Sequence, residues 1–123
     1  MMTGRITPDR EAVLDLVVAG SGRKQATLEA VIDTGFNGYL VLSSGLAHRL
    51  ELQLVGNRRA TLGDGHSILL EAYLGTAIWH GRERAILVLQ AEGGQLIGMS
   101  LLFGSRVTLD VTDGGEVTID PLS

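Results

Sequence analysis

The sequence lacks cysteine and long apolar runs. The absence of cysteine from its 123 residues excludes disulfide bonds and thiolate metal ligands. The longest apolar stretches, residues 16–19 and 85–89, are far too short to span a bilayer. The first residues, 1–11, contain no apolar core of a secretory signal. We therefore expect a cytoplasmic protein with no membrane partner.

Positive charge is scarce as well. The formal net charge is −4, and basic residues cluster no further than in pairs such as Arg58-Arg59. Nucleic-acid binding requires clustered Lys and Arg that neutralise phosphate, so we predict no nucleic-acid partner. None of the three histidines lies in a His-x-x-x-His pair, and no cysteine can complete a site. The sequence therefore predicts neither a metal site nor a cofactor.

Short glycine-containing turns recur between apolar stretches. They are Gly20-Ser21-Gly22, Asp64-Gly65, His80-Gly81, Glu92-Gly93-Gly94 and Asp113-Gly114-Gly115. This spacing is typical of an all-β protein. Residues 13–18 are predicted to pair with residues 26–32 across the first turn, and residues 107–111 with residues 117–119 across the last.

One short helix is expected among the strands. Ser44 can cap it, and Leu46 and Leu50 lie on the same face at a spacing of i, i+4. No composition shift or linker marks a domain boundary. We therefore predict a single domain over residues 1–123, built as a closed or partly closed β-barrel.

A single carboxylate follows the second of these predicted strands. In residues 25–32, apolar and polar side chains alternate as they do in a strand with one buried face. Asp33-Thr34-Gly35 comes directly after, and a second apolar run, residues 39–42, follows Gly38. The two glycines permit a sharp turn or the close approach of another chain. The pattern indicates a tight loop that presents the Asp33 carboxylate to a partner.

Val31-Ile32-Asp33-Thr34-Gly35 resembles the active-site signature of retropepsin-like aspartic proteases, which reads hydrophobic-hydrophobic-Asp-Thr/Ser-Gly. In that family a later strand ends in two apolar residues and a glycine, then leads into a short helix. Leu96-Ile97-Gly98 and the following residues 99–102 have this form, and Gly98 follows Asp33 by 65 residues. The resemblance extends over most of the chain, from about residue 11 to residue 119.

A glycine-rich turn between these motifs resembles the flap of the family. It is Leu62-Gly63-Asp64-Gly65-His66, and it is flanked by residues 55–61 and 68–74, which are predicted to form a hairpin. The resemblance implies that this hairpin, at about residues 55–74, closes over an extended peptide. Its apolar flanks, together with Ile97 and Gly98, would lie on the substrate side, where Ile97 lines a side-chain pocket.

The resemblance also implies a retropepsin-like acid-protease fold, all-β with one or two short helices and one lobe per chain. Hydrolysis by aspartates needs one ionised and one protonated carboxyl group, and two such groups share a proton because like charges about 3 Å apart cannot both ionise. The chain supplies one Asp-Thr-Gly loop, so the resemblance implies a homodimer with Asp33 of each subunit at the two-fold axis.

Further roles in the dimer follow from the resemblance alone. Thr34 would form a hydrogen bond across the dyad, and the backbone N–H of Gly35 would approach the carboxylate. The chain ends, residues 1–6 and 117–123, would interleave into an intersubunit sheet.

Two positions depart from the family pattern. Family members usually carry Ala or Ser after the signature glycine, whereas this chain has Phe36-Asn37, and an aromatic ring cannot supply a hydroxyl group to the carboxylate. Retroviral enzymes place a basic residue soon after the second glycine, where it forms an ion pair that supports the dimer. This chain has Met99-Ser100 there.

We predict an aspartic endopeptidase that hydrolyses peptide bonds of a peptide or protein substrate, with water activated by Asp33 of both subunits. Phe36 favours one alternative, a dimeric peptide-binding or assembly module that keeps the fold without turnover. Another is a monomeric small-ligand β-barrel unrelated to proteases. For Asp33 itself the plainer interpretation is an Asx-type turn that satisfies local backbone donors.

Overall fold

The structure is a computed structural model that describes residues 1–20, 22, 24–61 and 64–123. These residues form ten strands and two short helices. The strands are β1 (Met2–Ile6), β2 (Ala12–Ala19), β3 (Gln25–Ile32), β4 (Leu40–Leu42), β5 (Gln53–Thr61), β6 (Ser67–Trp79), β7 (Arg82–Gln90), β8 (Leu96–Ile97), β9 (Ser105–Leu109) and β10 (Glu116–Pro121). The helices are α1 (Ser44–Arg49) and α2 (Met99–Leu102). The prediction of a mostly β fold with one or two short helices is confirmed.

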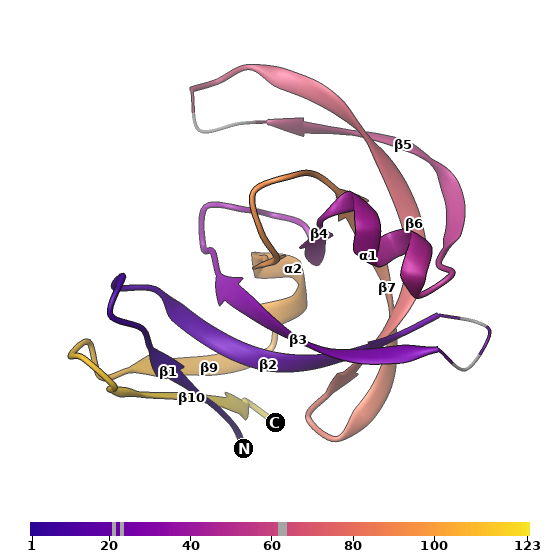
Figure 1. The fold of residues 1–123 in the computed structure, drawn as a ribbon. Helices are drawn as coiled ribbons and strands as arrows, with labels where there is room; N and C mark the ends of the chain where they lie inside the picture. Colours follow the sequence, from indigo (N-terminus) through magenta and orange to yellow (C-terminus); the bar gives the residue numbers. More distant parts are fainter. Residues whose placement is uncertain (21, 23, 62–63) are drawn as a thin grey trace.

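The described strands join into one sheet in the order β5-β6-β7-β4-β8-β3-β2-β1-β10-β9. The sheet also returns on itself, because β2 pairs with β6 through Val18 opposite Ala77 and Ala19 opposite Thr76. Strands β6, β7, β4, β8, β3 and β2 thus form a ring. The hairpin of β5 and β6 arches over one end of the molecule, and β1, β9 and β10 lie at the other (Figure 1).

Hydrophobic alternation explains why the strands pack as they do. In β3, Leu28 and Ala30 are buried while Gln25, Thr27 and Glu29 are exposed, so one face of the strand turns to the core. The main core joins side chains of the ring strands, both helices and β10. Each fully buried Leu or Ile side chain in it contributes roughly 1.5–3 kcal/mol. This packing fixes the short central elements that carry the Asp33 loop.

Both predicted hairpins are present. In the first, β2 pairs with β3 from Val13 opposite Val31 to Ala19 opposite Gln25. In the second, β9 pairs with β10 through Val107 opposite Ile119, although β9 ends at Leu109. The extension of that pairing to residue 111 was therefore wrong.

The predicted helix is α1, and Leu46 and Leu50 are both buried as its spacing indicated. The predicted cap was displaced by one residue. Ser43 occupies the N-cap position with an extended backbone, and Ser44 is the first helical residue. None of the described helices has the length and apolar character needed to cross a membrane.

The chain ends pair within the same chain. β1 lies between β2 and β10, and β10 lies between β1 and β9. The expectation that residues 1–6 and 117–123 supply an intersubunit sheet was therefore wrong for these strands, because both of their edges are occupied. Within the described residues, the strand at this end of the sheet with one open edge is β9.

Candidate active site

Asp33 begins the loop of residues 33–39, which connects β3 to β4. Both strands pair with the two-residue strand β8: Ile32 lies opposite Ile97 in a parallel pair, and Leu40 lies opposite Ile97 in an antiparallel pair. The backbone N–H of Asp33 donates to the Ile97 carbonyl at 2.9 Å. One buried residue of β8 therefore fixes both ends of the loop.

The Asp33 carboxylate is bound by its own loop. The Gly35 N–H donates to Oδ1 at 2.9 Å, and the Phe36 N–H donates to the Asp33 carbonyl at 3.2 Å. A Cβ on Gly35 would lie 3.2 Å from Oδ1, closer than most Cβ contacts, so glycine permits this approach. The hydrogen bond from the Gly35 N–H to the Asp33 carboxylate is also the bond that defines an Asx turn.

Helix α2 holds the loop from a second side. Three consecutive N–H groups at its start donate to loop carbonyls: Gly98 to Tyr39 (3.0 Å), Met99 to Phe36 (2.8 Å) and Ser100 to Gly38 (3.1 Å). The Ser100 hydroxyl adds a hydrogen bond to the Asn37 carbonyl. The loop backbone is thus held by partners that lie 59 to 63 residues away in the sequence.

The aromatic ring of Phe36 is built into this arrangement. A Cβ on Gly38 would lie 2.4 Å from Cζ of Phe36, and a Cβ on Gly98 would lie 2.5 Å from Cδ2. The Gly98 Cβ would also lie 2.2 Å from the Gly38 carbonyl oxygen. Since Cβ atoms do not approach other heavy atoms so closely, the ring occupies space that only glycine leaves open at these two positions.

Arg84 is a contributor that the sequence did not reveal. From β7 it donates through Nη1 to the Leu101 carbonyl at 3.2 Å and through Nη2 to the Ser100 carbonyl at 3.3 Å. Its guanidinium carbon lies 5.4 Å from the centre of the Tyr39 ring, within range of a cation–π contact. A cation therefore reaches α2 from a neighbouring strand. No local sequence signal connects Arg84 with α2, because only the tertiary structure brings them together.

Asp33 borders a cavity of about 360 Å³ between the loop and the hairpin. The other side chains around it are mainly apolar, among them Phe36, Val41, Ala60, Ile68, Leu70 and Leu96. An adjoining cavity of about 350 Å³ shares Gly35, Phe36, Ala60 and Thr61 with the first and adds Asn37, Gly38, Arg58, Arg59, Leu87 and Leu89. We call the two together the hairpin cleft.

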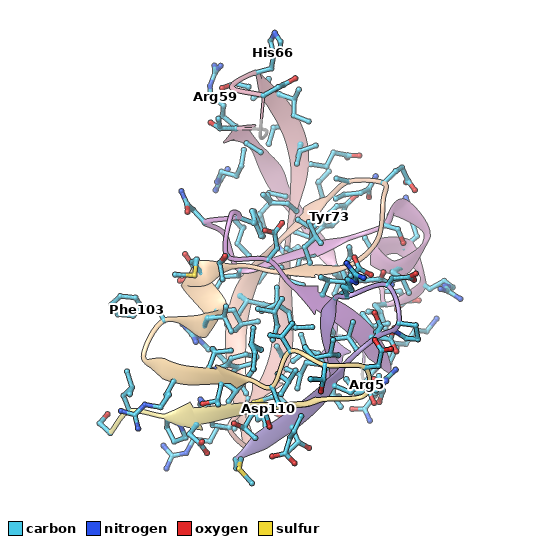
Figure 2. All side chains as sticks on the ribbon, turned by 90° about the vertical axis from the view of Figure 1, so that its left-hand side faces the viewer. Arg5, Arg59, His66, Tyr73, Phe103 and Asp110 are labelled. Carbon is cyan, nitrogen blue, oxygen red and sulfur yellow. The ribbon has the colours of Figure 1, made fainter. Side chains whose placement is uncertain are left out.

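The hairpin pairs β5 with β6 from Gln53 opposite Leu74 to Thr61 opposite Ser67. At its turn the Asp64 carboxylate accepts from the His66 N–H at 2.9 Å and contacts its Nδ1 at 2.9 Å. The side-chain hydrogen bond from His66 lowers the pKa of Asp64. Gly65 has a φ of +88°, which favours glycine. Figure 2 shows His66 at the outer end of the hairpin, far from the body of the molecule.

The remaining predicted site residues occupy different positions. Leu62 and Gly63 lie outside the described residues. The prediction that Ile97 lines a side-chain pocket was wrong, because Ile97 is fully buried in the main core and the neighbouring Leu96 borders the cavity. Gly98 packs beneath Phe36 and starts α2. Thr34 borders neither part of the hairpin cleft and lines a surface hollow beside β9 instead.

No group of three or more potential metal-binding side chains gathers in the described part of the chain. The titratable group at the centre of the site is Asp33, which lies half-buried at the border of the hairpin cleft. Glu92 borders the same cavity. The arrangement can present the Asp33 carboxylate to a ligand that lies between the loop and the hairpin.

No protein-family model matches the chain, and no curated protein matches it. Two solved structures are similar in fold. EIAV protease in complex with the inhibitor HBY-793 has a TM-score of 0.59 and 18% identity over 77% of this chain and 88% of that chain. A retropepsin-like aspartic protease from Rickettsia conorii has a TM-score of 0.60 and 15% identity over 99% of this chain and 91% of that chain. The chain therefore has the retropepsin-like fold that its Asp-Thr-Gly signature indicated.

Proposed function

We propose that the protein is a homodimeric aspartic endopeptidase in which Asp33 of two chains forms the catalytic dyad. One observation carries the proposal: in a chain with the retropepsin-like fold, the Asp-Thr-Gly carboxylate borders a largely apolar cleft covered by a hairpin. The hairpin serves as the flap and the cleft holds an extended peptide. Both solved structures named above are proteases by their own descriptions.

The chemistry divides two roles between two carboxyl groups. The ionised Asp33 takes a proton from water as the water oxygen attacks the scissile carbonyl carbon. The protonated Asp33 of the other subunit donates a hydrogen bond to the carbonyl oxygen. Proton transfer to the amide nitrogen then allows the C–N bond to break. The proton that is shared between the two carboxyl groups belongs to the pair and not to either subunit.

The surface beside β9 suits the subunit contact that the dyad requires. Thr34 lines a hollow of about 390 Å³ there together with Met99, Leu102, Phe103, Gly104, Ser105 and Val107. The Phe103 side chain is 85% exposed and Met99 is 46% exposed. Figure 2 shows Phe103 projecting from the body of the molecule. Exposed apolar side chains beside an open strand edge favour association.

The hydrogen bonds of β9 define which backbone groups are available for this contact. The Asp110 N–H donates to Glu116 and the Leu122 N–H donates to Gly104, both at 2.9 Å. Hydrogen-bonded and non-bonded pairs alternate in an antiparallel ladder. The even-numbered residues of β9 therefore form their backbone hydrogen bonds with β10. The N–H and C=O groups of Ser105, Val107 and Leu109 are therefore directed to the open edge.

Two copies of β9 can pair there as antiparallel strands about a two-fold axis. If the two-fold axis passes through Val107, every residue of β9 has a partner in the other copy, and Arg106 lies opposite Thr108. Centring it on Arg106 would place two like charges opposite each other, which is destabilising. We therefore assign the axis to Val107, on the side of the molecule where Thr34 lies.

A second candidate function is a dimeric peptide-binding module without turnover. Phe36 favours it, because the ring lines both parts of the hairpin cleft next to Asp33 and offers no hydroxyl group to the carboxylate. This candidate predicts peptide binding that does not depend on the charge of Asp33.

The deciding experiment is digestion of an unbiased peptide library between about pH 4 and 7, a range suited to a dyad that shares one proton. The native protein is compared with Asp33→Asn and with Asp15→Asn, which changes an exposed aspartate on β2. We expect cleavage that is lost only in Asp33→Asn. Binding without cleavage by a confirmed native dimer would support the binding module instead.

The subunit contact is tested separately by sedimentation velocity. Phe103→Asp places a charge on the proposed interface, whereas Leu69→Asp changes an exposed apolar residue of the hairpin. We expect Phe103→Asp to shift the dimer to monomer and Leu69→Asp to leave it intact. Dissociation by Leu69→Asp alone would place the interface elsewhere, and full cleavage activity in a strictly monomeric sample would contradict the dyad.

A further inference from the structure

The basic pair on the hairpin divides between its two faces. Side chains of paired residues in an antiparallel ladder share a face, and alternate residues of one strand do so too. Arg58 lies opposite Leu70, and Ala60 lies opposite Ile68. Ala60, Ile68 and Leu70 line the cavity that Asp33 borders, so Arg58 belongs to the cleft face.

Arg59 belongs to the other face of the same strand. It lies opposite Leu69, whose side chain is 66% exposed. Figure 2 shows Arg59 near the outer end of the hairpin. Both arginines border the second part of the hairpin cleft, but their side chains leave β5 in opposite directions.

The positive charge of Arg58 is not neutralised by a carboxylate within the described residues. The ion pairs there are Arg5 with Glu29, Lys24 with Glu51, and His66 with Asp64. The Arg58 Nη1 donates to the carbonyl of the adjacent Asn57 at 2.9 Å. It would lie 3.6 Å from a Cβ placed on Gly56, so the side chain runs back along the strand. A guanidinium group has five donors, and most of them remain for a ligand.

Much of the remaining lining of this part of the cleft is apolar. It includes Phe36, Leu87 and Leu89, and the Phe36 ring is held by its packing over Gly38 and Gly98. A cation beside a fixed aromatic and aliphatic surface suits a side chain that has methylene groups and a terminal carboxylate. The methylene groups would pack on Phe36 while the carboxylate pairs with the guanidinium fork.

We propose that Arg58 and Phe36 form a specificity subsite for an acidic side chain of the peptide held in the hairpin cleft, with glutamate preferred over aspartate. The longer glutamate places its carboxylate at Arg58 while keeping its methylene groups on Phe36. The remaining part of the cleft, lined by Val41, Ile68, Leu70 and Leu96, accepts an apolar side chain. The subsite rests on the proposed function, since it requires that the cleft binds peptide.

The first test compares cleavage specificity in the native protein, Arg58→Gln and Arg59→Gln. The two variants remove the same charge from opposite faces of one exposed stretch of strand. We expect the native protein to prefer Glu over Gln at one substrate position by about tenfold. Arg58→Gln should abolish that preference and Arg59→Gln should retain it, and Arg58→Glu should shift the preference toward Lys or Arg. An acid preference that is absent, or that survives Arg58→Gln, would overturn the subsite.

A second test separates the subsite from catalysis. Fluorescently labelled peptides that differ only in Glu or Gln are titrated with Asp33→Asn protein, with and without Arg58→Gln, and binding is measured by anisotropy. Glu-selective binding that requires Arg58 supports the subsite even when no form cleaves peptide, an outcome that would reject only the protease. Cleavage without acid selectivity rejects only the subsite. Absence of both cleavage and Arg58-dependent binding rejects both proposals.

Discussion

The two sides of the hairpin cleft are built in different ways. The Asp33 loop is held by β8, by three N–H groups at the start of α2 and by the Phe36 ring over two glycines. The hairpin side depends on the ladder between β5 and β6, and most side chains of β5 are exposed. Segments with few buried contacts open at a lower free energy than the core. The molecule thus combines a carboxylate loop that is held from several sides with a hairpin whose first strand is largely exposed.

The largest expected difference between the two sides comes from the same substitution at two leucines. Leu101 of α2 is fully buried in the main core, whereas Leu69 of the hairpin is largely exposed. Leu101→Ala should lower the free energy of unfolding by about 2–5 kcal/mol because it leaves a cavity. Leu69→Ala should change it by less than about 0.5 kcal/mol. Urea denaturation at one fixed protein concentration measures the free energy of unfolding of both variants. Equal losses in the two would contradict the proposed difference between the two sides of the cleft.

The packing of Phe36 gives a second, smaller effect. Gly38→Ala would press a Cβ against the Phe36 ring and should cost about 1–3 kcal/mol of stability. In a Phe36→Ala background the same change should cost little, since the three atoms nearest to that Cβ all belong to the Phe36 ring. Gly98→Ala is the control, because its closest contact is the Gly38 backbone carbonyl and its cost should persist. Additive losses in the double-mutant cycle for Gly38 and Phe36 would disprove the contact.

Arg84 should contribute somewhat less. Arg84→Gln removes two charge-assisted hydrogen bonds to the carbonyls of Ser100 and Leu101 and should lower the free energy of unfolding by about 1–2 kcal/mol. Hydrogen exchange in α2 should become faster. Arg82→Gln, an exposed change on the same strand, is the matched control. Unchanged exchange in α2 would mean that Arg84 does not support the loop.

The smallest expected effect is the pH dependence associated with His80. Burial is the main cause that lowers the pKa of His80 below 6.5; Arg84 lowers it further, and Asp120 opposes the change. The folded protein therefore binds this proton less readily than the unfolded chain, so stability falls as the pH drops below about 6.5. The loss is complete once the pH is below the folded pKa.

Chemical denaturation of native protein and His80→Gln at pH 7 and at pH 5 measures this contribution. We expect the native protein to lose more stability than the variant over that interval. The His80 Nε2 lies 2.9 Å from the Ser105 hydroxyl, so a comparison at pH 7 alone reports the loss of this contact. Equal pH dependence in the two proteins would show that His80 does not titrate as proposed.

Much of the fold could be predicted because its signals are local. The alternation in residues 25–32 and the turn after residue 19 indicated the hairpin of β2 and β3, and Leu96-Ile97-Gly98 indicated the short strand and helix at β8 and α2. Ile97 shows where such reasoning ends. An apolar residue at the end of a strand can face the cleft or the core, and the pairing of β8 with both β3 and β4 buries it.

Local sequence is enough to specify the strands, the turns and the position of Asp33 at the end of a strand, because backbone preference and hydrophobic period act between near neighbours. Long-range packing closes β2 onto β6, pairs β1 with β10 and brings Arg84 to α2. It also sets which arginine of the basic pair faces the cleft. Strand register and side-chain packing between distant segments set these contacts, and neither leaves a signal within a short stretch of sequence.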